Sequence, residues 1–417
     1  MSFSLVFRIQ GFLLLFLGLS MGLPPVVALC YGESSWRSFV FAIAICVLTG
    51  TCLILTCPAS EKQITHREGF LIVSLGWIFA ALFGCLPFIF DNTFSSFSDA
   101  YFETVSGFTT TGATVISNIE ALPKSILFWR SMVQWLGGMG IILFSIAILP
   151  LLGIGGMQLY KAEVPGPVVE KIKPRIAETA RSLWKVYILL SLTEALLLLL
   201  AGMDLFDAVC HTFTTMATGG FSTRNQSIES FQNPYIDMII IIFMFSAGMN
   251  FSLHYRVFHG NLKSLRLDKE FLFYLSLLVI ATVLLTLSVQ HTVYDNIFSS
   301  LRNSAFQATS IMTTTGFSTA NFDTWPLFSK FILLILMFIG GCAGSTGGGM
   351  KCIRILLIFK RTYRELFYMV HPHAVASVKI GGRSIPDNIL RGVSGFVILY
   401  VIIFILIKYI FYSLLFS

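Results

Sequence analysis

The sequence reads Thr-Thr-Thr-Gly-Ala-Thr over residues 109–114, and this run decides how the chain folds. Two related runs follow, Thr-Met-Ala-Thr-Gly-Gly-Phe-Ser-Thr at 215–223 and Thr-Thr-Thr-Gly-Phe-Ser-Thr at 313–319. A Thr-Gly step recurs in all three, at 111–112, 218–219 and 315–316, with spacings of 107 and 97 residues. One such step would indicate only a loop, but three copies indicate an internal repeat.

Each copy follows an apolar stretch of about ten residues, which is too short to cross a bilayer and has the length of a re-entrant half-helix. Non-helical backbone after it is tolerated at membrane depth only where protein encloses it or where it lines a wet path. Glycine lets successive carbonyls point one way, and such oxygens can replace the water shell of a cation. The residues predicted to form this ion filter are Thr110, Thr111, Gly112, Ala217, Thr218, Gly219, Thr314, Thr315 and Gly316.

The composition places these runs in a membrane protein. Of the 417 residues, 55% are hydrophobic and 12% are charged, whereas soluble domains carry about 25% charged residues. We predict an all-α polytopic membrane protein with repeated helix–half-helix–helix units around a central ion pore. Nine apolar stretches are predicted to span the bilayer, near 5–30, 37–57, 69–90, 126–153, 183–203, 234–258, 271–290, 327–360 and 392–414.

The charges orient these spans. With a cytoplasmic N-terminus, the inner loops hold 21 of the 28 Lys and Arg residues, as the positive-inside rule requires. Because these basic residues lie between apolar spans, the net charge of +7 does not indicate nucleic-acid binding. We expect an outer vestibule that concentrates cations, formed by Glu33, Asp91, Asp99, Glu103, Glu120, Asp204, Asp207, Glu229, Asp237, Asp295 and Asp323.

A glycine-rich run, Gly-Gly-Cys-Ala-Gly-Ser-Thr-Gly-Gly-Gly at 340–349, interrupts the apolar stretch after the third copy. Each glycine costs a helix about 1 kcal/mol relative to alanine, so the helix is expected to unwind here. We interpret the run as a flexible gate below the filter, and the alternative is close helix packing through small residues. The predicted gate residues are Gly340, Gly341, Gly344, Gly347, Gly348 and Gly349, with Lys351 and Arg354 on the cytoplasmic side.

Other chemistries find little support in the sequence. A membrane-embedded enzyme would need acids, His or Cys converging at one depth, and only Glu194 and His211 lie suitably. The eight cysteines form no CxxC pair or Cys/His cluster, so neither a disulfide framework nor a zinc site is predicted. We therefore predict no enzyme and no cofactor. A less selective pathway for Na⁺ and K⁺, as a channel or symporter, remains the alternative to potassium conduction.

The three Thr-Gly runs, together with the segment from Gly340 to Lys351, resemble the Trk/Ktr/HKT potassium transporter superfamily. The two additional N-terminal spans resemble its Trk-type membrane subunit rather than the shorter Ktr type. The resemblance implies four pore repeats, usually in a homodimer, and potassium uptake across a bacterial inner membrane. It also implies a TrkA-like cytoplasmic nucleotide-binding regulatory subunit that docks on the basic inner loops, besides contact with membrane lipid.

The resemblance also suggests how the chain is divided. Residues 1–58 would form a two-span extension, and 59–160, 161–262 and 263–365 the first three pore repeats, the third carrying the glycine-rich loop. A fourth filter would fall about 100 residues after Gly316, near the last residue of the sequence. Residues 366–417 are therefore expected to be the start of an incomplete fourth repeat. A pore lined on three sides would expose backbone to lipid, where each unsatisfied group costs several kcal/mol.

Overall fold

The structure, a computed structural model, describes residues 3–58, 65–140, 176–374, 376–381 and 383–416. At the N-terminus, α1 (Phe3–Ser20) and α2 (Leu23–Tyr31) make one apolar span, which is interrupted before α2, where Pro24 lies in the first turn. The next span is α3 (Trp36–Thr56). α1 packs along both α3 and α4, and the buried Gln10 side chain donates a hydrogen bond to the carbonyl of Ile72 at 2.9 Å. The extension is thereby joined to the first pore unit.

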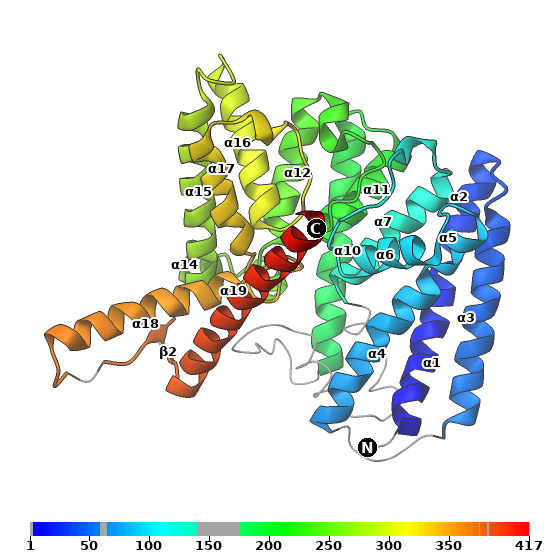
Figure 1. The fold of residues 1–417 in the computed structure, drawn as a ribbon, viewed down its shortest axis with the longest axis horizontal. Helices are drawn as coiled ribbons and strands as arrows, with labels where there is room; N and C mark the ends of the chain where they lie inside the picture. Colours follow the sequence, from blue (N-terminus) through cyan, green and yellow to red (C-terminus); the bar gives the residue numbers. More distant parts are fainter. Residues whose placement is uncertain (1–2, 59–64, 141–175, 375, 382, 417) are drawn as a thin grey trace.

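Three units of one design follow, and Figure 1 shows them side by side. Each contains a long helix, a short helix and a second helix. The first unit comprises α4 (His66–Gly84) with its continuation α5 (Leu86–Phe90), α6 (Phe97–Phe108) and α7 (Lys124–Gly138). The second comprises α10 (Ile176–Leu200), α11 (Leu205–Met216) and α12 (Pro234–Ala247), and the third α15 (Lys269–Val289), α16 (Ile297–Met312) and α17 (Leu327–Phe338). Single 3₁₀ turns follow the short helices: η1 (Ile119–Ala121), η3 (Ser227–Phe231) and η4 (Phe322–Thr324).

The short helices are half-helices in length. They contain 12, 12 and 16 residues, which at 1.5 Å per residue amounts to about 18–24 Å, less than the roughly 30 Å of a bilayer core. Side chains cap two of their N-termini, since Ser96 accepts from the Asp99 amide and Asn296 from the Phe298 amide. The half-helices expected before each Thr-Gly run are therefore present.

Contacts between the units follow one rule. The second helix of each unit packs against the half-helix of the next, α7 against α11 and α12 against α16. Within each unit the half-helix packs against its own second helix, as α6 does on α7 and α16 on α17. Parallel repeats joined in this way succeed one another around a common axis, which brings the ends of the half-helices together.

The stretch at 234–258 is not straight. α12 and α13 (Phe251–Phe258) meet at 104°, with Gly248 at the end of α12 and the Asn250 side chain capping α13. A Cβ at position 248 would lie 2.5 Å from the Tyr274 hydroxyl and 2.9 Å from a methyl group of Thr313. Glycine is therefore required where this bend approaches the third unit. The short α14 (Lys263–Leu267) then leads into α15.

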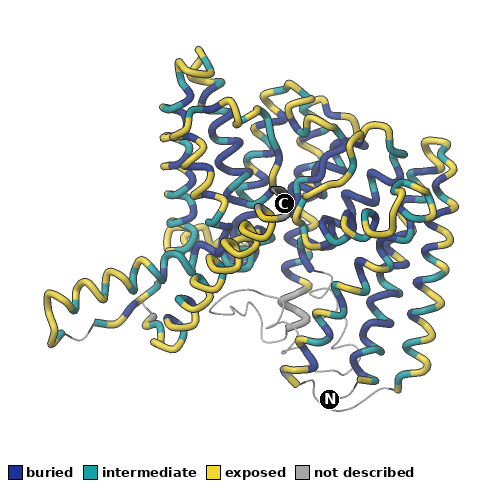
Figure 2. Tube along the Cα trace, viewed as in Figure 1, coloured by how far each residue is buried: buried dark blue, intermediate teal, exposed yellow. Residues whose placement is uncertain are grey.

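The chain leaves the bundle after α17. An irregular loop, residues 339–351, connects α17 to α18 (Cys352–Val370), which runs outward, as Figure 1 shows. A hairpin of β1 (Lys379–Ile380) and β2 (Arg383–Ser384) precedes α19 (Asp387–Phe416), whose apolar side chains are largely exposed (Figure 2). Of the described residues, six segments are long and apolar enough to span a membrane, and the bent α12–α13 pair would make a seventh. The predicted spans at 126–153 and 327–360 are only partly represented, because 141–153 lies outside the described residues and 327–360 is interrupted by the loop.

Candidate functional site

The three Thr-Gly runs adopt the same backbone conformation where the half-helices end. In each, a threonine and the residue two positions later have positive φ angles of 53–84°, and the amide between them donates to a carbonyl five residues earlier at 2.9 Å. The positive-φ pairs are Thr110 and Gly112, Thr218 and Gly220, and Thr314 and Gly316. We call these three segments, 109–112, 217–220 and 313–316, the first, second and third filter segments.

This geometry corrects the alignment of the second copy. The sequence paired Gly219 with Gly112 and Gly316, but the structure places Gly220 at the equivalent position. Gly219 corresponds instead to Thr111 and Thr315. The amide at this position closes the turn in every copy, onto Ser106, Thr214 and Ser310 respectively. Gly220 therefore belongs to the site, although the sequence did not select it.

The filter segments touch one another through backbone carbonyls. A Cβ at Gly112 would strike the carbonyl oxygen of Gly219, and a Cβ at Gly220 would strike that of Thr315. Glycine is needed at each of these two positions for two reasons. It adopts the left-handed φ angle, and it leaves room for the carbonyl of the neighbouring segment. The first segment is thereby in backbone contact with the second, and the second with the third.

A buried ion pair joins the stretches of chain that follow the first and second segments. Arg130 on α7 and Glu103 on α6 are 2% and 1% exposed, and Nε lies 2.6 Å from Oε1. Glu103 also accepts from the Thr114 hydroxyl at 2.9 Å, whereas Arg130 donates to the carbonyl of Ser222 at 3.0 Å. The guanidinium lies 3.6 Å from the centre of the Phe221 ring. One pair therefore holds the chain that follows both filter segments.

Gln134, one turn further along α7, holds the second segment directly. Its buried amide donates to the Gly219 carbonyl at 2.8 Å and accepts from the Phe221 amide at 3.1 Å. A Cβ at Gly219 would lie within 2.4–2.7 Å of this amide group, which accounts for the glycine there. The Gly219 oxygen is thus fixed by a protein donor.

The glycine-rich loop lies against the second and third segments. The Thr346 hydroxyl donates to the carbonyl of Met216, where the second half-helix ends, at 3.0 Å. The Gly348 amide donates to the Thr314 hydroxyl at 2.7 Å. The Cys342 amide donates to the carbonyl of Gly248 at 2.8 Å, which fixes the loop to the bend after α12. The loop is therefore docked on filter residues.

Within the loop, the predicted gate residues have distinct roles. Gly344 and Gly349 have φ angles of +73° and +65°, and a Cβ at Gly340 would strike the Gly348 carbonyl. Gly341 and Gly347 approach each other, since a Cβ at 347 would be 3.4 Å from the amide of 341. The buried Lys351 ammonium donates to the Gly347 carbonyl. Lys351 thus folds back onto the loop.

The side chain of Arg354 makes no hydrogen bond to the glycine-rich loop among the described contacts. Its guanidinium stacks on the Phe396 ring in α19, 3.9 Å from the ring centre. Of the two basic side chains expected beside the loop, only that of Lys351 is hydrogen-bonded to it in the part of the chain that the structure describes.

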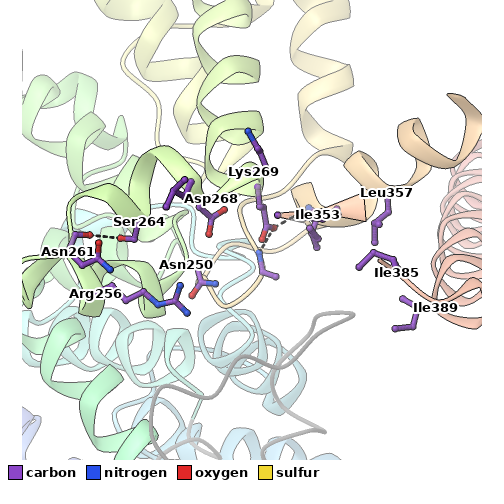
Figure 3. Close-up of a pocket in the computed structure, with 15 residues that line it drawn as sticks. Asn250, Arg256, Asn261, Ser264, Asp268, Lys269, Ile353, Leu357, Ile385 and Ile389 are labelled. Atoms are coloured by element: carbon purple, nitrogen blue, oxygen red, sulfur yellow. Dashed lines mark hydrogen bonds between the residues drawn. The ribbon is translucent and has the colours of Figure 1, made fainter. Parts of the chain in front are cut away.

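Glu270, at the start of α15, holds the loop to α18. Its Oε1 accepts from the Ala343 amide at 2.7 Å and from the Ile353 amide at 3.0 Å, so it joins the loop to the first turn of α18. Figure 3 shows these bonds at the edge of a cavity of about 420 Å³. Polar groups such as Asn250 and Arg256 line one side of it, and Leu357 and neighbouring isoleucines line the other.

Comparison with known proteins shows to which family this chain belongs. The family described as "TrkH: Cation transport protein" matches residues 36–411, which is most of the chain. The chain belongs to this TrkH family. It is 46% identical over 409 residues to the Trk system potassium uptake protein TrkH of Salmonella typhimurium (strain LT2), covering 97% of this chain and 85% of that protein.

A second relative and a solved structure support the same family assignment. The Trk system potassium uptake protein TrkG of Escherichia coli (strain K12) is 39% identical over 393 residues, covering 94% of this chain and 81% of that protein. The crystal structure of the potassium transporter TrkH from Vibrio parahaemolyticus superposes with a TM-score of 0.87 at 41% identity, covering 97% of this chain and 85% of that one. The predicted Trk-type family and the all-α polytopic fold class are confirmed.

Several acids of this TrkH-family chain that were assigned to an outer vestibule have structural partners instead. Asp207 binds Arg224 at 2.7 Å, and Asp237 lies 3.3 Å from Arg302. Glu33 accepts from the amide of Lys124 at 2.6 Å. Glu103, Asp207 and Asp237 thus each face an arginine, and Glu33 is engaged by an uncharged amide, which weakens the argument for a cation-concentrating vestibule.

The sequence missed Gly220, Gln134, Glu270 and the roles of Glu103 and Arg130. For the last two a signal existed, because opposite charges in a half-helix and in the following apolar span invite pairing within the membrane. His211 is buried and supports the second segment, with Nε2 3.0 Å from the Ser222 hydroxyl. Among the described residues, no group of three His, Cys, Asp or Glu side chains could hold a metal ion.

Proposed function

We propose that this chain is the ion-conducting membrane subunit of a potassium uptake system. Two relatives that match nearly the whole chain are named as potassium uptake proteins of the Trk system. The ion is the transported substrate rather than a cofactor. Members of this group are transporters, so the proposed activity is transport and not catalysis.

The observation that carries this proposal is the contact between equivalent backbone segments. Gly112 and Gly220 each face a carbonyl oxygen of the next filter segment. Carbonyl and hydroxyl oxygens gathered in this way can replace water around a K⁺ ion. The proposed filter consists of the nine residues predicted from the sequence with Gly220 added. The Gly219 oxygen contributes less, because Gln134 already donates to it.

The glycine-rich loop is proposed to gate this filter from the cytoplasmic side. Its support is the set of hydrogen bonds from Thr346 and Gly348 to the ends of the second half-helix and the third filter segment. Deleting residues 344–347 is expected to raise K⁺ flux, because the loop could then no longer reach Met216. Unchanged flux in the deletion variant would exclude gating by this loop.

The proposed setting is a bacterial inner membrane, with the N-terminus in the cytoplasm. The name "Trk system" of the relatives indicates other Trk components. A TrkA-like nucleotide-binding regulatory subunit would dock on the basic inner loops, and the assembly would be a homodimer surrounded by lipid. Pull-down of purified TrkA-like protein and cross-linking of the chain with itself would test these partners.

The decisive experiment is ion flux in reconstituted liposomes. We expect K⁺ gradients to drive uptake of Rb⁺ into vesicles that contain the protein, with Na⁺ competing poorly. Absence of any cation flux would refute the proposal. Equal flux of Na⁺ and K⁺ would favour the alternative, a less selective monovalent cation pathway, which suits the family's broader description as cation transport proteins.

A further inference from the structure

The third filter segment is bonded to the loop through the side chain of one threonine. The Gly348 amide donates to the Thr314 hydroxyl at 2.7 Å. Two neighbouring residues of the loop lie close to the third filter segment. A Cβ at Gly347 would lie 3.1 Å from the Thr313 carbonyl oxygen, and a Cβ at Gly348 would lie 3.2 Å from the Thr314 hydroxyl. The loop therefore packs on the segment as well as lying below it.

The equivalent threonines have other surroundings. The Thr218 hydroxyl donates to the neighbouring Ala217 carbonyl at 2.6 Å, and its segment is held by Gln134. Between the described residues, no hydrogen bond joins Thr110 to the loop. The three threonines nevertheless share positive φ angles of 53°, 53° and 61°. Thus one of three similar positions depends on the loop for its partner.

Positive φ is unfavourable for a β-branched residue, so its neighbours must maintain it. At position 314 the loop supplies one of these constraints. When the loop moves away, the Gly348 amide leaves with it and Thr314 loses that constraint. The carbonyl of Thr315, which lies against Gly220, is attached to the same short stretch of backbone.

We propose that Thr314 is a specificity-determining residue whose conformation depends on the loop, so that the loop's position sets ion selectivity as well as rate. This inference rests on the proposed transport function. The Glu270 clamp, which joins the loop to α18, would carry movement of the cytoplasmic side to the filter.

The test compares Thr314→Val, which removes the hydroxyl at nearly constant shape, with Thr314→Ser, which keeps it. Both are made in the full chain and in a variant lacking residues 346–348, with Thr110→Val and Thr110→Ser as matched controls. A hydrogen bond of this kind corresponds to about a fivefold change in an equilibrium. We expect the K⁺/Na⁺ permeability ratio in liposomes to be about fivefold lower for Thr314→Val than for Thr314→Ser in the full chain.

In the deletion background this difference at position 314 is expected to disappear, whereas any difference at position 110 should be the same in both backgrounds. A valine–serine difference at 314 that persists after the deletion would overturn the inference. So would a difference at 110 that responds equally to the deletion. Absence of K⁺ flux through the unmodified protein would instead refute the proposed function.

Hydrogen exchange provides a second measurement that needs no transport. The Gly348 amide in Thr314→Val protein should exchange about fivefold faster than in Thr314→Ser protein. Thr110→Val should leave exchange at Gly348 as in the unmodified protein. Equal exchange in the two Thr314 variants would show that the hydroxyl does not hold the loop, and would end the argument even if the variants conduct poorly.

Discussion

The Arg130–Glu103 pair offers a test of how the first two filter segments are held together. Arg130→Met removes the cation and leaves a carboxylate that is 1% exposed. Breaking a buried pair from one side typically costs about 3–5 kcal/mol, because the remaining charge stays desolvated. The variant also loses the hydrogen bond to the Ser222 carbonyl and the contact with the Phe221 ring. We expect a clear fall in the thermal unfolding midpoint in detergent.

The double variant Arg130→Met with Glu103→Leu separates stability from function. Replacing both members by apolar side chains of similar size removes the unpaired charge, so most of the lost stability should return. Selectivity should not return, because the link that runs from the Thr114 hydroxyl through Glu103 and Arg130 to the Ser222 carbonyl is then lost. The K⁺/Na⁺ ratio in liposomes measures this. A double variant that recovers both stability and selectivity would refute the bracing role.

Three further changes test other contacts. Gln134→Leu removes both hydrogen bonds to the second segment and should lower the K⁺/Na⁺ ratio by about fivefold, whereas an unchanged ratio would contradict the clamp. Glu270→Ala frees the loop from α18 and should raise K⁺ flux, but Glu270→Gln keeps an acceptor oxygen and should behave like the unmodified protein; equal fluxes of the two variants would exclude the clamp. Gly137→Ala places a Cβ against the Phe108 carbonyl and should destabilise by about 1–3 kcal/mol in thermal unfolding. Gly395→Ala in α19, with no described atom within 4 Å of its added Cβ, is the control and should stabilise by up to about 1 kcal/mol.

The sequence predicted the half-helices and the glycine-rich loop because both follow from local quantities. The length of an apolar stretch, compared with the thickness of the bilayer, predicts a half-helix. A high glycine content predicts that a helix unwinds, and neither prediction requires knowledge of the tertiary structure. Pairing across the fold was not predictable in that way. Glu103 was assigned to the outer vestibule, yet it pairs with Arg130, which is 27 residues away and meets it only after α6 packs on α7. Arg354 was placed beside the loop by proximity in sequence, whereas its actual partner, Phe396, is on α19.

The bend between α12 and α13 shows the same limit. The apolar pattern over 234–258 predicts one straight span, because a hydropathy profile does not show where a helix bends. The structure turns there by 104°, and Tyr274 and Thr313 of the third unit occupy the space that a side chain at Gly248 would need. The loop then uses the Gly248 carbonyl as an anchor. A glycine that looked incidental in the sequence is thus a meeting point of the second unit, the third unit and the loop.

The second filter segment explains why the repeat looked irregular in sequence. In the first and third segments, paired threonine hydroxyls lie 2.8 Å apart, Thr109 with Thr111 and Thr313 with Thr315. In the second segment these positions are Ala217 and Gly219, and the Gln134 amide fills the space where a side chain at 219 would stand. The polar group comes from α7 instead of from the segment itself. The absence of the two threonines and the presence of a second glycine thus go together with the Gln134 amide that occupies the space. It follows that restoring a threonine at 219 would displace Gln134 and disrupt the second segment, even though it would make the three sequences more alike.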